Sequence, residues 1–199
     1  INPAFEAVKL LPDTIEGAKI HKLEIPTVFK KDGEVLAKAI EEQNPDIVIC
    51  VGQAGGRSDI SVEKVAINLM EARIPDNEEQ QPLNQVIYED GETAYFATLP
   101  VKAMVSNVKE AGIPSSVSYT AGTFVCNDIM YRLLYLADKE GKNLKGGFIH
   151  VPYLPEQVID LPVGTPSLSV ETIAKGLEAA VAAAVINDED QNVAMGTIM

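Results

Sequence analysis

Cys126 is the residue whose place in the sequence most clearly suggests chemistry. The run Ser118–Cys126 leaves a strand-like segment, passes through a turn of small residues and enters an amphipathic helix. The first N–H groups of a helix lack partners inside the helix and carry the positive end of its dipole, so they favour a thiolate and can also bind an oxyanion. Cys126 is therefore a candidate nucleophile; the alternative is a buried thiol that only packs at a strand–helix junction.

A nucleophilic thiol needs a base, and the chain has two histidines. His150 ends the apolar run Phe148–Val151, and ligands in open α/β sheets gather at the carboxyl ends of strands. If the strands Ser115–Ser118 and Phe148–Val151 are parallel neighbours, Cys126 and His150 emerge at the same edge of the sheet. His21 precedes the first extended segment, and we expect it to be an exposed polar residue.

The second cysteine suggests packing rather than chemistry. Cys50 ends an apolar strand, where a free cysteine behaves as a small hydrophobic side chain. Two cysteines in unlike contexts do not resemble a disulfide framework, so we expect both to be reduced. The two cysteines and two histidines also lack metal-ligand spacing, and the sequence predicts neither a metal nor a cofactor.

A Cys–His pair needs a third group that orients the imidazole, usually a carboxylate or an amide. Glu63 is a candidate because it lies in an apolar run after a glycine-rich turn. From spacing alone, a solvated acid on a polar face is the favoured interpretation of Glu63. Asp59, Glu71 and Asp76 remain rivals at this point.

The turn Gly52–Gly56 follows a strand, as phosphate-binding loops do. Its spacing matches neither the Gly-x-Gly-x-x-Gly pattern nor a Walker loop, and the chain has no Gly-x-Ser-x-Gly elbow. A nucleoside- or phosphate-binding enzyme is therefore a weaker alternative.

Composition restricts the class of protein. The chain has 199 residues, 46% of them hydrophobic, so one domain over residues 1–199 is expected. Its net charge of −13 argues against nucleic acid as a partner. No apolar run approaches the roughly 20 residues that span a bilayer, so we expect no membrane association and a cytoplasmic protein.

Strand-like and helical runs alternate along the chain, which indicates an α/β fold with a mostly parallel sheet between helical layers. Apolar runs such as Ile47–Val51 are typical of strands covered on both faces. Pro75–Gly91 is polar and predicts an excursion over the surface or across a subunit boundary, and the tail from Asn187 is expected to fray. The expected elements are Ala4–Leu11, Gly33–Gln43, Val101–Ala111, Asn127–Asp138 and Val170–Ile186 as helices, Lys22–Val28 as an extended segment, and Asp46–Gly52, Ser115–Ser118 and Gly147–Val151 as strands.

Two long motifs resemble the pyroglutamyl peptidase I family, cysteine peptidases that remove N-terminal pyroglutamate. The first runs from Gly52 through Glu63 to Asn68, and the second from Ser118 through Cys126 to Asn127 with Tyr131 following. Further similarity lies in Ala72–Asn77, Ala94–Phe96 and Phe148–Pro155. The resemblance covers nearly the whole chain and implies an α/β/α sandwich.

The resemblance also implies roles for individual residues. Cys126 would be the nucleophile, His150 the general base and acid, and Glu63 the residue that orients the histidine. The side chains implied at the pyrrolidone ring are Phe124, Gln53 and Asn2. Arg73 is a further candidate for substrate binding, as a donor to the carbonyl oxygen under attack. Phe124 could equally serve core packing, and Asn2 could simply begin a helix before Pro3. The implied substrates are peptides with N-terminal pyroglutamate, and the implied assembly is a homotetramer.

One departure from the family concerns the start of the chain. Family members usually carry an apolar strand and a Gly-Phe-x-Pro-Phe-Gly loop just before the Asn-Pro found here at Asn2 and Pro3. This sequence lacks both, and the loop supplies aromatic walls of the ring pocket. The alternative function is therefore a catalytically impaired protein that binds pyroglutamyl peptides on the same fold.

Overall fold

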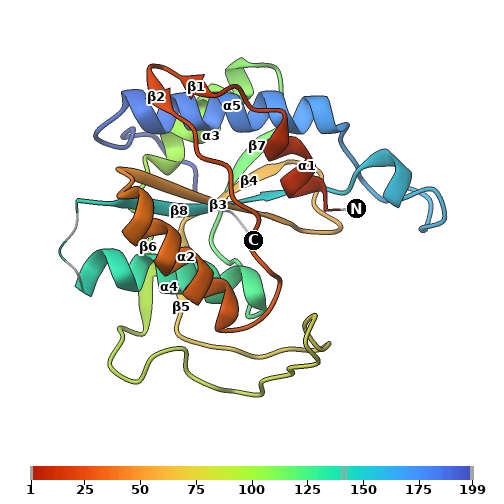
Figure 1. Cartoon of the computed structure of the whole chain (residues 1–199). Helices are drawn as coiled ribbons and strands as arrows, with labels where there is room; N and C mark the ends of the chain where they lie inside the picture. Colours follow the sequence, from red (N-terminus) through yellow and green to blue (C-terminus); the bar gives the residue numbers. More distant parts are fainter. Residues whose placement is uncertain (1, 140, 142, 198–199) are drawn as a thin grey trace.

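The computed structural model describes residues 2–139, 141 and 143–197. A central sheet lies between two layers of helices, with α1, α3 and α5 on one face and α2 and α4 on the other (Figure 1). The helices are α1 (Pro3–Lys9), α2 (Lys31–Gln43), α3 (Val101–Glu110), α4 (Val125–Lys139) and α5 (Val170–Ile186), with a short 3-10 helix η1 (Pro155–Gln157). The expected α/β/α sandwich is confirmed.

Among the described residues, four strands form the central sheet in the order β3-β8-β4-β7, namely β3 (Ile47–Gln53), β8 (Lys145–Val151), β4 (Ile60–Glu63) and β7 (Ser115–Ser118). β3 pairs with β8 and β4 with β7 in parallel, whereas β8 and β4 are antiparallel. Two of the three pairings are therefore parallel, as expected of a mostly parallel sheet. Two further pairs lie outside it, β1 (Thr14–Ile15) with β2 (Ala18–Lys19) and β5 (Val65–Ile67) with β6 (Ala94–Phe96).

The assumed neighbour relation between the strands Ser115–Ser118 and Phe148–Val151 is wrong. β4 lies between them, and because β4 is parallel to β7 but antiparallel to β8, the two strands run in opposite directions. β4 is absent from the expected elements because its four residues alternate between apolar and polar side chains and follow a polar turn. A short strand of this kind gives little signal, although here every residue of it is buried.

The predicted elements otherwise agree with the structure within about two residues. One exception is Lys22–Val28, which forms no strand. A second concerns β3, whose residues are only half-buried because, in the described part of the chain, it pairs with β8 alone. β8 shows the burial expected of a covered strand, since six of its seven residues are buried.

The polar stretch Pro75–Gly91 is confirmed as a surface excursion, part of the long loop that runs below the helical layer in Figure 1. Asp76 anchors this loop by accepting hydrogen bonds from the backbone N–H groups of Phe29, Glu78 and Gln80. The tail behaves differently from expectation, because Asp190 accepts hydrogen bonds from the N–H groups of Lys102 and Ala103 at the start of α3. The tail is thus docked on a helix N-terminus rather than frayed.

Among the described helices, none combines the length and apolar character needed to cross a bilayer.

Candidate active site

One face of the sheet gathers the residues that could do chemistry. Side chains alternate along each strand, so paired residues of neighbouring strands share a face. The ladder pairs on this face are Cys50 with Phe148, Gly52 with His150, Ser61 with His150, and Glu63 with Phe148. Helices α2 and α4 cover this face (Figure 1).

Glu63 and His150 form a buried hydrogen-bonded pair across β4 and β8. The distance from His150 Nδ1 to Glu63 Oε1 is 2.7 Å, and both side chains are almost completely buried. The carboxylate can only accept, so Nδ1 carries the proton and Nε2 is left free to accept one. This is the arrangement that a general base requires.

Cys126 lies over the same part of the sheet. It is the second residue of α4, and a Cβ atom built on Gly52 would lie 3.1 Å from its Sγ. Gly52 is the ladder partner of His150, so the thiol lies beside the imidazole's strand position. The segment 119–124 brings the chain from β7 back across the sheet to this point. The thiol therefore reaches the sheet face that carries His150 by a different route from the one expected.

The thiol of Cys126 is held in its neutral form. Burial raises its pKa to about 12, the negative charges of Glu63 and Asp32 add to the rise, and Arg57 and its own backbone N–H oppose it. The expected preference of the helix start for a thiolate is present but outweighed. A reaction at this sulfur therefore needs a base that removes the proton during attack.

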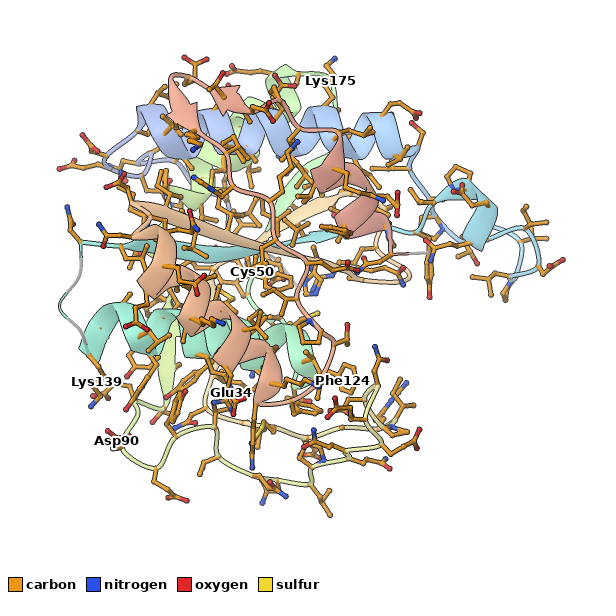
Figure 2. All side chains as sticks on the ribbon, in the orientation of Figure 1. Glu34, Cys50, Asp90, Phe124, Lys139 and Lys175 are labelled. Carbon is orange, nitrogen blue, oxygen red and sulfur yellow. The ribbon has the colours of Figure 1, made fainter. Side chains whose placement is uncertain are left out.

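Cys50 is a free cysteine on the same face, and burial raises the pKa of its thiol to about 12 as well. It lies in the centre of the sheet, between the two helical layers (Figure 2). Its ladder partner is Phe148, so no base pairs with it across the strands.

The rivals of Glu63 lie elsewhere. Asp59 accepts a hydrogen bond from Ser61 Oγ at the start of β4, Glu71 is exposed, and Asp76 anchors the surface loop. Only Glu63 among the four candidates hydrogen-bonds to His150. His21 is exposed, as expected.

The four candidates for substrate binding are not all brought to the thiol. Phe124 lies at the N-terminal end of α4, on the side of the long loop, and packs edge-on against Phe29 at 5.2 Å between ring centroids (Figure 2). Gln53 leaves β3 on the face opposite Gly52, and its Oε1 accepts a hydrogen bond from Gln157. Asn2 caps α1 by accepting from the N–H of Ala4, and Arg73 is exposed.

Arg57 also belongs to this cluster of side chains, although its residue type and position alone did not single it out. Its Nη1 lies 2.6 Å from the same Glu63 oxygen that accepts from His150, and its Nη2 donates to the carbonyl oxygen of Thr120 at 3.0 Å. An arginine in the turn just before a buried glutamate was the available signal. The importance of Gly52 was also missed, since nothing in the sequence shows which helix covers a strand.

Two further buried carboxyl groups, those of Asp32 on α2 and Asp128 on α4, lie between these two helices. Asp128 Oδ2 accepts from Arg132 Nε at 3.0 Å, and Asp32 Oδ1 accepts from the N–H of Gly33 at 2.6 Å. The other oxygen of each carboxylate has no hydrogen-bond partner in the described part of the chain. Burial, together with the negative charge of Asp128, raises the pKa of Asp32 to about 8, so Asp32 is largely protonated at neutral pH.

Comparison with known proteins places the chain in a family. The family model described as pyroglutamyl peptidase matches residues 1–187 of the chain. The chain belongs to the pyroglutamyl peptidase family. It is 58% identical over 198 residues to the pyrrolidone-carboxylate peptidase of Clostridium perfringens, which covers 100% of this chain and 92% of the relative. The enzyme of the same name from Enterococcus faecalis is 58% identical over 197 residues, covering 99% of this chain and 92% of that protein.

Solved structures of the family share the fold. The crystal structure of pyroglutamyl peptidase I from Bacillus amyloliquefaciens superimposes with a TM-score of 0.94 at 47% identity, over 98% of this chain and 92% of that one. The pyrrolidone carboxyl peptidase of Thermococcus litoralis gives a TM-score of 0.88 at 40% identity, over 92% of this chain and 86% of that one. The family resemblance inferred from the sequence motifs is confirmed.

Proposed function

We propose that this protein is a cysteine peptidase that hydrolyses the bond after an N-terminal pyroglutamyl residue, with Cys126 as nucleophile, His150 as base and acid, and Glu63 as the residue that orients His150. The observation that carries the proposal is the buried Glu63–His150 hydrogen bond of 2.7 Å beside the thiol of Cys126. Membership of the pyroglutamyl peptidase family supports the same reaction.

In the first half of the reaction, His150 Nε2 takes the proton from the thiol as the sulfur attacks the carbonyl carbon that joins pyroglutamate to the next residue. The imidazolium formed is stabilised by Glu63 and then gives its proton to the leaving amine, which leaves a thioester on Cys126. In the second half, His150 removes a proton from water, the hydroxide adds to the thioester, and the proton returns to the departing sulfur. Free pyroglutamate is released and the neutral thiol is restored.

The negative charge on the carbonyl oxygen during attack needs donors. The backbone N–H of Cys126 lies in the first turn of α4, where it has no partner inside the helix. We assign it as one oxyanion donor, and a backbone N–H of the turn 55–57 or the side chain of Arg73 as the second.

The ring of pyroglutamate has no free α-amine, so its site needs an apolar slot with a few hydrogen bonds to the lactam. Phe124, two residues before the nucleophile, is proposed as the apolar wall. Gln53 and Asn2 are proposed as lactam contacts from the other side of β3, because α1, which Asn2 begins, packs against that strand. A ring analogue that loses one lactam contact leaves a buried polar group unpaired and should be strongly rejected.

We further propose that the protein is cytoplasmic, forms a single domain and works as a homo-oligomer, a tetramer by resemblance to the family. Two free cysteines fit a reducing compartment. Exposed large apolar side chains fit an interface, among them Ile74, Leu83, Ile159 and Val163.

Cleavage of a fluorogenic pyroglutamyl amide tests the nucleophile. We expect activity in the unmodified protein, loss of at least about 10³-fold in Cys126→Ser and near-normal rates in the matched control Cys50→Ser. Iodoacetamide should inactivate the Cys50→Ser variant. Activity that survives in Cys126→Ser would overturn the assignment. Binding of a pyroglutamyl peptide without turnover would favour the impaired-binding alternative, which none of the comparisons supports.

A pair of isosteric changes tests the orienting acid. Glu63→Gln should lower kcat by roughly 10²–10⁴-fold, because an amide no longer fixes the imidazole tautomer or stabilises the imidazolium. Asp76→Asn changes a buried carboxylate in the same way but outside the site. A larger loss of kcat in Asp76→Asn than in Glu63→Gln, with both proteins folded by circular dichroism, would contradict the role of Glu63.

A further inference from the structure

The guanidinium of Arg57 connects two parts of the site that come from distant segments. Nη1 pairs with Glu63 Oε1 at 2.6 Å, and Nη2 donates to the carbonyl oxygen of Thr120 at 3.0 Å. Thr120 belongs to the segment 119–124, which carries the chain into Cys126. Arg57 itself lies in the turn after β3. Two backbone hydrogen bonds hold this turn in place, from Ala54 N–H to Val151 O and from Arg57 N–H to Ala54 O.

The pairing matters because Glu63 is completely buried. A buried carboxylate stays ionised only if cations or hydrogen-bond donors compensate for the lost water. Glu63 Oε1 accepts from both Arg57 and His150, whereas Oε2 has no hydrogen-bond partner among the described residues. Arginine is always charged, so it supplies a permanent positive charge where the histidine supplies one only when protonated.

We propose that Arg57 is a positioning residue for this reaction: it holds the Glu63 carboxylate in place against His150 Nδ1, and it ties this pair to the segment that presents Cys126. The catalytic part of the inference rests on the proposed function. Arg57 acts through Glu63 and through the Thr120 carbonyl, and its planar fork reaches both at once.

The positive charge of Arg57 also limits protonation of His150. The Arg57 guanidinium and the His150 imidazole both contact Glu63 Oε1, so the two groups repel each other whenever the imidazole is charged. The other titratable groups around this site are the thiols of Cys126 and Cys50 and the carboxyl group of Asp32 from α2, whose charges act on one another. Replacing Arg57 leaves all of these in place and removes one cation. His150 should then take up a proton at a higher pH.

Two variants separate charge from geometry. Arg57→Gln should lower kcat/KM for a pyroglutamyl amide by about 10²-fold at pH 7 and move the acid limb of the pH profile about one unit higher. Arg57→Lys keeps the charge but loses the fork, so its acid limb should return to that of the unmodified protein while kcat/KM stays reduced. Lys64→Gln is the matched control, since it removes a cation next to Glu63 whose side chain makes no ion pair within the described residues; it should leave the profile unchanged.

NMR titration of the ring signals gives a readout that does not depend on turnover. The chain has only two histidines, and His21 is exposed, so the His150 signals are readily assigned. In Arg57→Gln, His150 should titrate at a higher pH while His21 is unaffected. An unchanged acid limb together with an unchanged His150 titration would overturn the proposal and leave Arg57 a structural contact. If the unmodified protein cleaves no pyroglutamyl amide but the His150 titration still moves, the proposed function fails and the role of Arg57 in the Glu63–His150 pair stands.

Discussion

Gly52 shows how a residue without a side chain can make room for a candidate nucleophile. A Cβ at this position would lie 2.6 Å from Phe148 Cζ and 3.1 Å from Cys126 Sγ. Because Gly52 has no side chain, the thiol of Cys126 can lie close to β3 beside β8, the strand that carries His150. Any larger residue must displace either the sulfur or Phe148, whose ring packs 4.7 Å from that of His150.

Gly52→Ala should therefore damage catalysis more than folding. We expect a loss of kcat of at least about tenfold, because a displacement of about 1 Å at the reacting atoms is costly, and a destabilisation of about 1–3 kcal/mol from overpacking. Steady-state kinetics and urea unfolding would measure the two effects.

The matched control is Gly147→Ala in β8. Its Cβ would lie equally close, 2.6 Å, to Leu99 Cδ1, but on the opposite face of the sheet. Its stability should fall by a similar amount while kcat stays near that of the unmodified protein. Equal losses of kcat in the two variants would show that the Gly52 effect is only a packing defect.

The sequence predicted the site unevenly at this scale. Residue type, scarcity and position were enough to propose Cys126 and His150, whereas Glu63 was separated from Asp59, Glu71 and Asp76 only by the family resemblance. The missing information was β4, since only its pairing with β8 brings Glu63 to His150. Arg57 depends on the same pairing, because its partner is the carboxylate at the end of β4.

At the scale of elements, α2 and α4 meet through carboxylates rather than through apolar side chains alone. Asp32 and Asp128 are both completely buried, with one cation, Arg132, bonded to Asp128. Burial and, second, the charge of Asp128 raise the pKa of Asp32. The contact between α2 and α4 is therefore most stable when Asp32 is protonated. This contact should therefore respond to pH.

The sign of that response follows from linkage. Asp32 has a pKa of about 8 in the folded protein and near 3.8 when unfolded, so the folded state binds the extra proton and its stability falls as pH rises between these values. Asp32→Asn mimics the protonated form and should remove this part of the pH dependence. From pH 6 to pH 8, the unmodified protein should lose on the order of 2 kcal/mol of unfolding free energy relative to the variant.

Urea unfolding at both pH values measures this difference. Asp46→Asn, an acid at the entry to β3 outside the carboxylate pair, serves as the control and should leave the slope of stability with pH unchanged. Parallel pH curves for Asp32→Asn and the unmodified protein would show that Asp32 does not hold a proton in the folded state.

Most element boundaries were predictable from the sequence, but the topology was not. The runs of α5 and β7 were placed to the residue, since each is bounded by clear turn signals. α4 begins two residues earlier than expected, at Val125, which moves Cys126 into its first turn. The order of the strands could not be derived from the sequence. The antiparallel pairing of β8 with β4 lies between two parallel pairings, and it leaves no sequence pattern within either strand.

At the scale of the whole molecule, the segment between β8 and α5 stands out from the body of the protein (Figure 1). It carries Ile159 and Val163 with exposed fractions of 76% and 107%. Isolated exposed apolar residues are common, but a projecting segment that presents them is typical of an interface. This supports the proposed homo-oligomer.

Light scattering after size-exclusion chromatography tests that assembly. The unmodified protein should elute as an oligomer, and the double change Ile159→Ser, Val163→Ser should lower its mass at micromolar concentration, because the apolar area buried between copies would shrink. Leu10→Ser, which alters an apolar residue of 55% exposure on another part of the surface, should leave the mass unchanged. A monomeric unmodified protein would contradict the proposal.

We expect the antiparallel pairing of β4 with β8 to determine when the protein gains catalytic activity during folding. Glu63 and His150 are 87 positions apart, so their hydrogen bond closes a long loop. Helices such as α4 form from local contacts on much shorter timescales. Recovery of turnover after dilution from denaturant should therefore lag behind recovery of helical circular dichroism. The catalytic assay would then report the rate at which β4 pairs with β8.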